Sequence, residues 1–140
     1  IASMAGLVHM PQASAYNATK AAVVALSETL QLELEADGIR VSVVCPAFFR
    51  TGLAGNMRAA NPALEGMTKR LVERARIGAD EIADRIFDGM ARGDPHILTH
   101  PEARRFWRMK RLLPYRLYLA LMRRQLSRVA ARMRRKAASR

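Results

Sequence analysis

The sequence predicts an α/β fold: the C-terminal part of a doubly wound parallel sheet, followed by a basic amphipathic helical tail. The first observation is an alternation of strand, helix, strand, helix and strand patterns within residues 1–100. The second is the run IRVSVVC at residues 39–45, whose apolar character is typical of a strand buried in a parallel sheet. The third is charge, since residues 1–100 carry a net charge of −1 and residues 101–140 a net charge of +13. We therefore predict one domain over residues 1–100 and a separate tail over residues 101–140.

The longest helix of the domain is predicted between Ala13 and Asp37. Ser14 is placed to cap its start, because a serine hydroxyl can accept a hydrogen bond from an amide of the first turn. Gly38 is expected to end it, since glycine adopts the left-handed conformation common just past a helix. Apolar residues recur at steps of three and four along this stretch, at Val23, Leu26, Leu30 and Leu34.

The next elements follow the same alternation. Residues 39–45 form a strand that the following proline ends, and residues 47–78 are less regular, with glycines and prolines among apolar residues. A second helix is predicted after Gly78 and before Gly93. Residues 96–99 predict a short last strand. One side of the second helix carries Ile82, Ile86, Phe87 and Met90.

Composition excludes several classes of protein and site. The single Cys45 excludes an internal disulfide and a cysteine-based zinc site, and it fits a reducing compartment. Its position between valines and a proline predicts a buried, inert thiol. His9, His96 and His100 match no compact zinc spacing, so we predict no metal site. No apolar run approaches the ~20 residues that cross a bilayer and no secretory signal is visible, which predicts a cytoplasmic protein.

Three polar side chains are suited to share one proton: Ser3, Tyr16 and Lys20. Tyr16 and Lys20 lie four residues apart in the predicted helix and therefore one turn apart on the same face. A lysine ammonium beside a phenol stabilises the phenolate, so such a tyrosine can give and take a proton as a general acid or base. The Ser3 hydroxyl could hold the oxygen that receives this proton. The pattern predicts an enzyme.

These segments resemble the second half of a short-chain dehydrogenase/reductase (SDR): IAS at 1–3, YNATK at 16–20 and VVCPAFFRTGL at 43–53. In that family a serine precedes the tyrosine of Tyr-x-x-x-Lys by 13 positions, as Ser3 precedes Tyr16. The resemblance covers residues 1–100 and implies the C-terminal half of a Rossmann-type domain. It implies that residues 47–78 form the substrate loop, and that the glycine-rich phosphate turn lies upstream. The 140 residues alone are then expected to be inactive.

The resemblance also implies a reaction: hydride transfer between NAD or NADP and a carbonyl or alcohol substrate, which the basic tail suggests is lipophilic. Tyr16 would be the general acid or base, Ser3 would hydrogen-bond the reacting oxygen, and Lys20 would also bind the nicotinamide ribose. Full-length members of the family are often homo-oligomers. The residues expected to border the nicotinamide, besides Tyr16 and Lys20, are Pro46, Ala47 (usually a glycine in the family) and Thr51. The residues expected to line the substrate pocket, besides Ser3, are Met4, His9, Phe48, Phe49 and Met57.

Each of these patterns has an alternative. Tyr16 and Lys20 could be a surface pair on an amphipathic helix, and Phe48 and Phe49 could belong to the core. Ser3 with His9 could suggest a hydrolase, but the G-x-S-x-G turn is absent. A second functional class is a catalytically inactive fragment that binds a membrane surface or a protein through its basic tail.

The tail has its own prediction. Residues 101–140 hold 14 lysines and arginines against one acidic residue, and beyond Pro114 apolar residues recur at helical steps. A basic amphipathic helix of this kind favours the surface of an anionic membrane. The alternative is that the apolar stripe packs on protein and the arginines face solvent. Nucleic-acid binding is disfavoured, because no nucleic-acid-binding module accompanies the charge. The stripe comprises Leu119, Met122, Leu126, Val129 and Met133.

Overall fold

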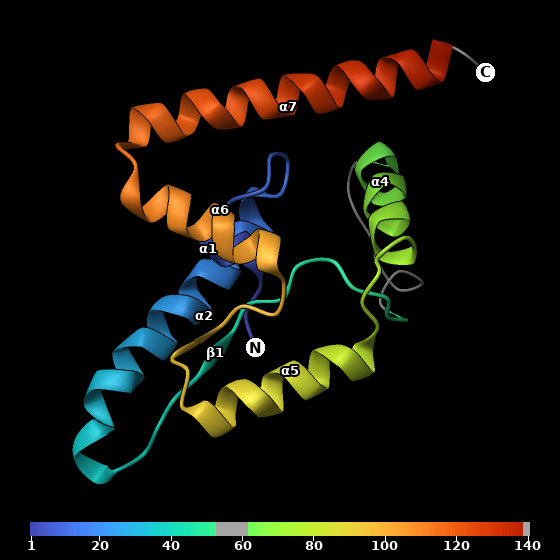
Figure 1. The fold of residues 1–140 in the computed structure, drawn as a ribbon. Helices are drawn as coiled ribbons and strands as arrows, with labels where there is room; N and C mark the ends of the chain where they lie inside the picture. The colour runs from blue at the N-terminus through green and yellow to red at the C-terminus, as the bar shows by residue number, and fades with distance from the viewer. Residues whose placement is uncertain (53–61, 139–140) are drawn as a thin grey trace. The chain divides into compact units, whose positions relative to one another are not determined.

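The computed structural model describes residues 1–52 and 62–138, and it divides into two compact units, Ile1–Arg104 and Arg105–Arg140. Each unit is described by itself (Figure 1). The first unit is an α/β fold with a short parallel sheet. Its elements are α1 (Met4–Leu7), α2 (Ser14–Glu33), the 3₁₀ turn η1 (Glu35–Asp37), β1 (Val43–Val44), α4 (Pro62–Glu73), α5 (Ala79–Arg92) and β2 (His96–Ile97). Helix α6 (Pro101–Leu112) begins in the first unit, and α7 (Tyr115–Ala138) lies in the second.

Strand β1 lies at the centre of three extended segments. It pairs in parallel with β2, with Val43 beside His96 and Val44 beside Ile97. On its other edge, the Ala2 amide donates to the Val44 carbonyl at 2.8 Å. The predicted parallel order is therefore confirmed, although the regular strands are shorter than residues 39–45 and 96–99.

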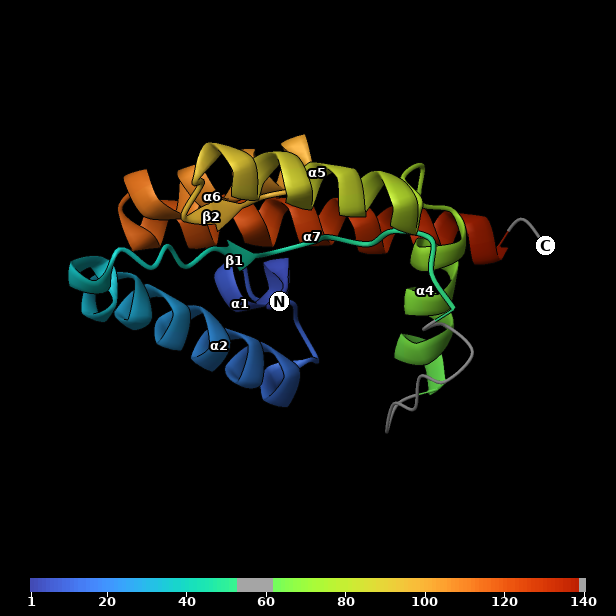
Figure 2. The same ribbon diagram turned by 90° about the horizontal axis from the view of Figure 1, so that it is seen from below.

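Helices cover both sides of these strands. In both views α2 and α5 lie on opposite sides of β1 (Figures 1 and 2). A Cβ added at Gly89 of α5 would lie 2.8 Å from Ile97 Cγ1, so glycine is what allows this helix to approach β2 closely. Val43 and Cys45 are buried as predicted, at 1% and 0% exposed, but Ile39 at the start of the predicted strand is 52% exposed.

Helix α2 and its ends follow the sequence pattern with one correction. Gly38 adopts φ 70° at the end of η1, as expected of a glycine that stops a helix. Ser14 is not the N-cap: Ala13 occupies that position without a side-chain hydrogen bond. Instead, the buried Asn17 reaches back, its Nδ2 donating to the Met10 carbonyl at 2.7 Å and its Oδ1 accepting from the Met10 amide at 3.2 Å. Asn17 thus fixes the turn that Ser14 was expected to cap.

Helix α5 begins after Gly78 and ends before Gly93, which has φ 72°, so both predicted limits are confirmed. Its apolar face is narrower than predicted. Ile82 is buried, but Phe87 is 71% exposed. At 3.6 residues per turn, Phe87 lies about 140° around the helix from Ile82 and cannot share its buried side.

The packing of α1 on α2 gives a first testable prediction. A Cβ at Gly6 would lie 2.6 Å from the Lys20 carbonyl oxygen, and backbone cannot move away as a side chain can. We therefore expect Gly6→Ala to destabilise the fold by about 1–3 kcal/mol. The matched control is Gly66→Ala in α4, where a Cβ would meet no heavy atom of the described residues within 4 Å. Equal unfolding midpoints in urea for the two variants would contradict this packing.

The second unit is dominated by α7, which follows Pro114. The rings of Tyr115 and Tyr118 stack with centroids 6.1 Å apart. Several large apolar side chains are exposed, including Leu112 at 79% and Leu117 at 48%. Over the residues that the structure describes, no helix is long and apolar enough to cross a membrane.

Candidate functional site

Two segment ends meet at one edge of the sheet. The extended segment that begins the chain reaches Ser3 and Met4, and the Met4 amide donates to the Pro46 carbonyl at 2.9 Å. The Ser3 backbone also hydrogen-bonds the thiol of Cys45, the residue just after β1. The C-terminal ends of adjacent parallel strands are where open α/β sheets bind ligands. Ser3 and Pro46 therefore lie where a site is expected.

Ser3 caps α1 and keeps a hydroxyl hydrogen that it can donate. Its backbone is extended, and its Oγ caps α1 by accepting from the Ala5 amide at 3.2 Å. This cap uses an acceptor lone pair and not the hydroxyl hydrogen. The hydroxyl can therefore donate to a substrate oxygen while it holds the helix start.

Tyr16 and Lys20 lie on one face at the start of α2. The Lys20 Nζ is 5.8 Å from the centroid of the Tyr16 ring, so the ammonium and the phenol are neighbours. Tyr16 is 46% exposed. The close approach of Gly6 to the Lys20 carbonyl joins α1, which Ser3 caps, to the helix that carries Tyr16.

The segment after β1 contains the residues predicted to border the nicotinamide. Pro46 is buried, and Ala47 and Thr51 are partly buried. The predicted pocket residues Phe48 and Phe49 lie in the same segment and are also partly buried.

The structure describes two of the three other predicted pocket residues. Met4 lies directly after Ser3 at the start of α1 and is partly buried. His9 is exposed in the turn before α2. Met57 lies outside the described residues.

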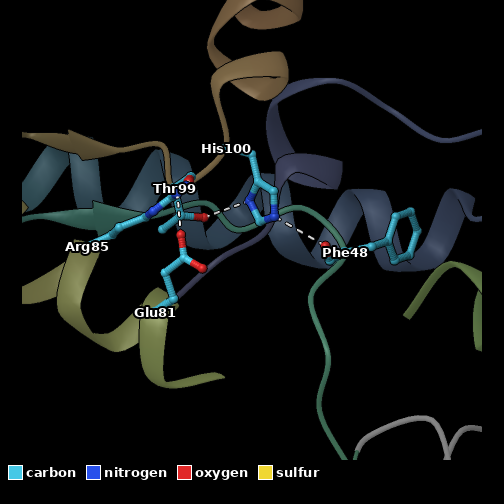
Figure 3. Close-up of polar contacts among 5 residues, drawn as sticks. All are labelled: Phe48, Glu81, Arg85, Thr99 and His100. Carbon is cyan, nitrogen blue, oxygen red and sulfur yellow. Dashed lines mark hydrogen bonds and ion pairs between the residues drawn. The ribbon is translucent and has the colours of Figure 1, made fainter. Parts of the chain in front are cut away.

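His100 is the part of this region that the sequence patterns missed (Figure 3). It is buried, and its Nδ1 accepts from the Ala47 amide at 3.3 Å and from the Thr99 hydroxyl at 2.9 Å. Its Nε2 then carries the proton and donates to the Phe48 carbonyl at 3.2 Å. We call these three hydrogen bonds the His100 clip. Its only sequence signal was a histidine that follows the last predicted strand.

The surroundings of His100 keep its ring neutral. Burial lowers the pKa of His100 from its ordinary value of 6.5. The Phe48 carbonyl and the carboxylates of Glu102 and Glu81 oppose this shift, and Arg85 adds to it. Arg85 also donates to the Thr99 carbonyl and pairs with Glu81 at 2.6 Å, as the dashed lines in Figure 3 show.

Cys45 and His96 lie elsewhere around the strands. Burial raises the pKa of Cys45 to about 11, so it is a buried thiol of low reactivity. The ring of His96 pairs with Glu28 at 2.8 Å. Among the residues described, no group of three or more His, Cys, Asp or Glu side chains could hold a metal ion.

Comparison with known proteins finds sequences similar to this chain in one protein family. A model of the short chain dehydrogenase family matches residues 1–62. The dehydrogenase/reductase SDR family member 7B of Mus musculus is 31% identical over 98 residues, which are 70% of this chain and 30% of that protein. The inactive 2-(S)-hydroxypropyl-CoM dehydrogenase 2 of Xanthobacter autotrophicus is 38% identical over 82 residues, covering 56% of this chain and 36% of that protein.

A solved structure agrees with the sequence matches. The short chain dehydrogenase/reductase SDR from Burkholderia phymatum, crystallised in complex with NAD, superimposes with a TM-score of 0.68 and 34% identity. The match covers 79% of this chain and 44% of that one. The chain thus spans less than half the length of the solved relative and about a third of the curated relatives described above.

Proposed function

Since this chain belongs to the short-chain dehydrogenase/reductase family, we propose that the protein containing it is an NAD(P)-dependent oxidoreductase acting on a carbonyl or alcohol group. The observation that carries this proposal is the meeting of Ser3 and Pro46 at one sheet edge, with Tyr16 and Lys20 on the helix that packs on α1 at Gly6.

The residues of this chain would manage the proton and the reacting oxygen. Tyr16 would donate a proton to the carbonyl oxygen in reduction, and accept it from the hydroxyl in oxidation. Ser3 would donate a hydrogen bond to the same oxygen and stabilise its developing negative charge. The Lys20 ammonium, close to the Tyr16 ring, would stabilise the phenolate that remains after proton donation. The bound nicotinamide supplies or accepts the hydride.

The residues present fit one end of a dinucleotide. The Lys20 ammonium offers three donors suited to ribose hydroxyls. Pro46, Ala47 and Thr51 supply backbone and a small hydroxyl side chain beside the same strand end. The Ala47 amide is used by the His100 clip, so its contact with a ligand would be through the Cβ or the carbonyl.

The proposed activity is tested with the full-length protein, NADH or NADPH and a panel of ketones and aldehydes. We expect consumption of one reduced cofactor, followed by absorbance, with at least one member of the panel. The second functional class is a catalytically inactive fragment that binds a membrane surface or a protein through its basic tail, and one similar protein is named as inactive. No oxidation of either cofactor across the panel would favour that class.

We also propose that the second unit binds an anionic membrane surface and that the substrate is lipophilic. Support comes from exposed leucines on the same helix as exposed arginines, among them Leu117, Leu121, Arg116 and Arg123.

For the first unit we propose homo-oligomer formation through α2, on which Leu26 is 60% and Leu32 is 76% exposed. Large exposed apolar side chains on a helix are typical of an interface.

A further inference from the structure

We propose that His100 is a positioning residue for the cofactor: its ring fixes the backbone of Ala47 and Phe48, the segment against which the nicotinamide is expected to bind. The proposal rests on the proposed function and adds to it a residue that is not among the predicted site residues. His100 itself is not expected to touch the substrate.

The His100 clip holds two consecutive backbone residues in one conformation. Ala47 and Phe48 follow a two-residue strand and have no regular ladder of their own. The ring bonds one residue through its amide and the next through its carbonyl, so it fixes the orientation of both. Holding a binding segment in its bound conformation reduces the entropy lost when the ligand binds.

The His100 ring is itself held in place by Thr99, which Arg85 contacts in turn. The Thr99 hydroxyl donates to Nδ1, and Arg85 of α5 donates to the Thr99 carbonyl. The clip thus connects α5 and the end of β2 to the segment that follows β1 (Figure 3). A buried network of this kind is costly to break in part, because the remaining donors and acceptors lose their partners.

Protonation would open the clip. A proton on Nδ1 would face the Ala47 amide with a donor where it now finds an acceptor, whereas the Thr99 hydroxyl could rotate to accept. Because the pKa of His100 is lowered in the folded protein, an opened state binds more protons than the clipped state. The clip is therefore at full strength above the ordinary value of 6.5 and weakens as pH falls below it. The charged groups that face the ring are Glu81, Arg85 and Glu102.

The test compares three variants of the full-length protein by calorimetric titration with NAD and with NADP. His100→Leu removes all three hydrogen bonds, and we expect the Kd of the preferred cofactor to rise about tenfold. His100→Asn keeps an acceptor near the position of Nδ1 and should recover part of this loss. The matched control is His96→Asn on β2, whose ring pairs with Glu28; its Kd should equal that of the wild type.

The pH dependence of the cofactor Kd distinguishes a positioning role of His100 from a general contribution to the stability of the fold. Between pH 8 and pH 5.5 the wild-type Kd should rise more steeply than that of His100→Asn, which has no ring to protonate. Equal Kd values for the wild type and His100→Leu, or parallel pH profiles for the wild type and His100→Asn, would overturn the inference and leave the proposed function intact. If His100→Leu does not fold, the pH profiles alone decide. A wild type that binds neither cofactor would overturn the proposed function and this inference together.

Discussion

Replacing Tyr16 with phenylalanine is expected to lower the kcat of the full-length protein by about 10²–10⁴-fold, the usual contribution of a positioned general acid or base. The change removes one oxygen and leaves the ring, so the contact between the ring and the Lys20 ammonium is retained. The KM for the cofactor should change little, since the proton donor acts on the substrate oxygen. Steady-state kinetics at saturating cofactor measure both quantities.

A second tyrosine provides the control for this experiment. Tyr115→Phe removes the same hydroxyl from an exposed tyrosine of the second unit, 63% exposed, and should leave kcat unchanged in solution. Unchanged turnover in Tyr16→Phe would show that another group transfers the proton. The family assignment would stand in that case, and the proton-transfer role of Tyr16 would not.

Exchanging four exposed arginines of α7 for glutamine is expected to weaken membrane binding by a factor on the order of 10³. Each basic residue near an anionic surface contributes about 1 kcal/mol, and about 1.4 kcal/mol corresponds to tenfold in affinity. The apolar residues of the helix stay in place, so the variant isolates the charge. The four residues are Arg116, Arg123, Arg124 and Arg128, all exposed.

Co-sedimentation with vesicles measures this effect. Vesicles of phosphatidylcholine with phosphatidylserine should bind the wild type, and vesicles of phosphatidylcholine alone should bind it far less. A variant with lysine at the same four positions keeps the charge and should bind like the wild type. Equal binding of the glutamine and lysine variants would contradict an electrostatic attachment and favour packing of this helix on protein.

The sequence predicted those parts of the fold that depend on local signals. Gly38 and Gly93 end their helices in the left-handed conformation, because few other residues adopt it without strain. Val43, Val44 and Cys45 are buried because strands of a parallel sheet are covered by helices on both faces. The neighbouring positions of Tyr16 and Lys20 follow from helical spacing alone.

The parts that the sequence could not predict depend on contacts between distant residues. His100 bonds a backbone segment about fifty positions earlier, and no local pattern marks that pairing. Asn17 took over the turn assigned to Ser14 because its side chain, one turn inside the helix, reaches Met10. Phe87 followed the predicted apolar period, but the close contact of Gly89 with Ile97 decided which side of α5 is buried.

The parallel pairing of β1 with β2 also bears on how the protein acquires its structure. Partners such as Ala47 and His100 are 53 positions apart in the chain, so a long loop must close before they can meet. Closing such a loop costs entropy before any contact compensates for it, and chains rich in distant pairings fold slowly. Helix α2 contains its own hydrogen bonds and can form early, which would bring Tyr16 and Lys20 together before the strand ends beside them are in place. The order of assembly would then run from Tyr16 and Lys20 to the segment that we propose borders the cofactor, with the latter among the last regions to become rigid.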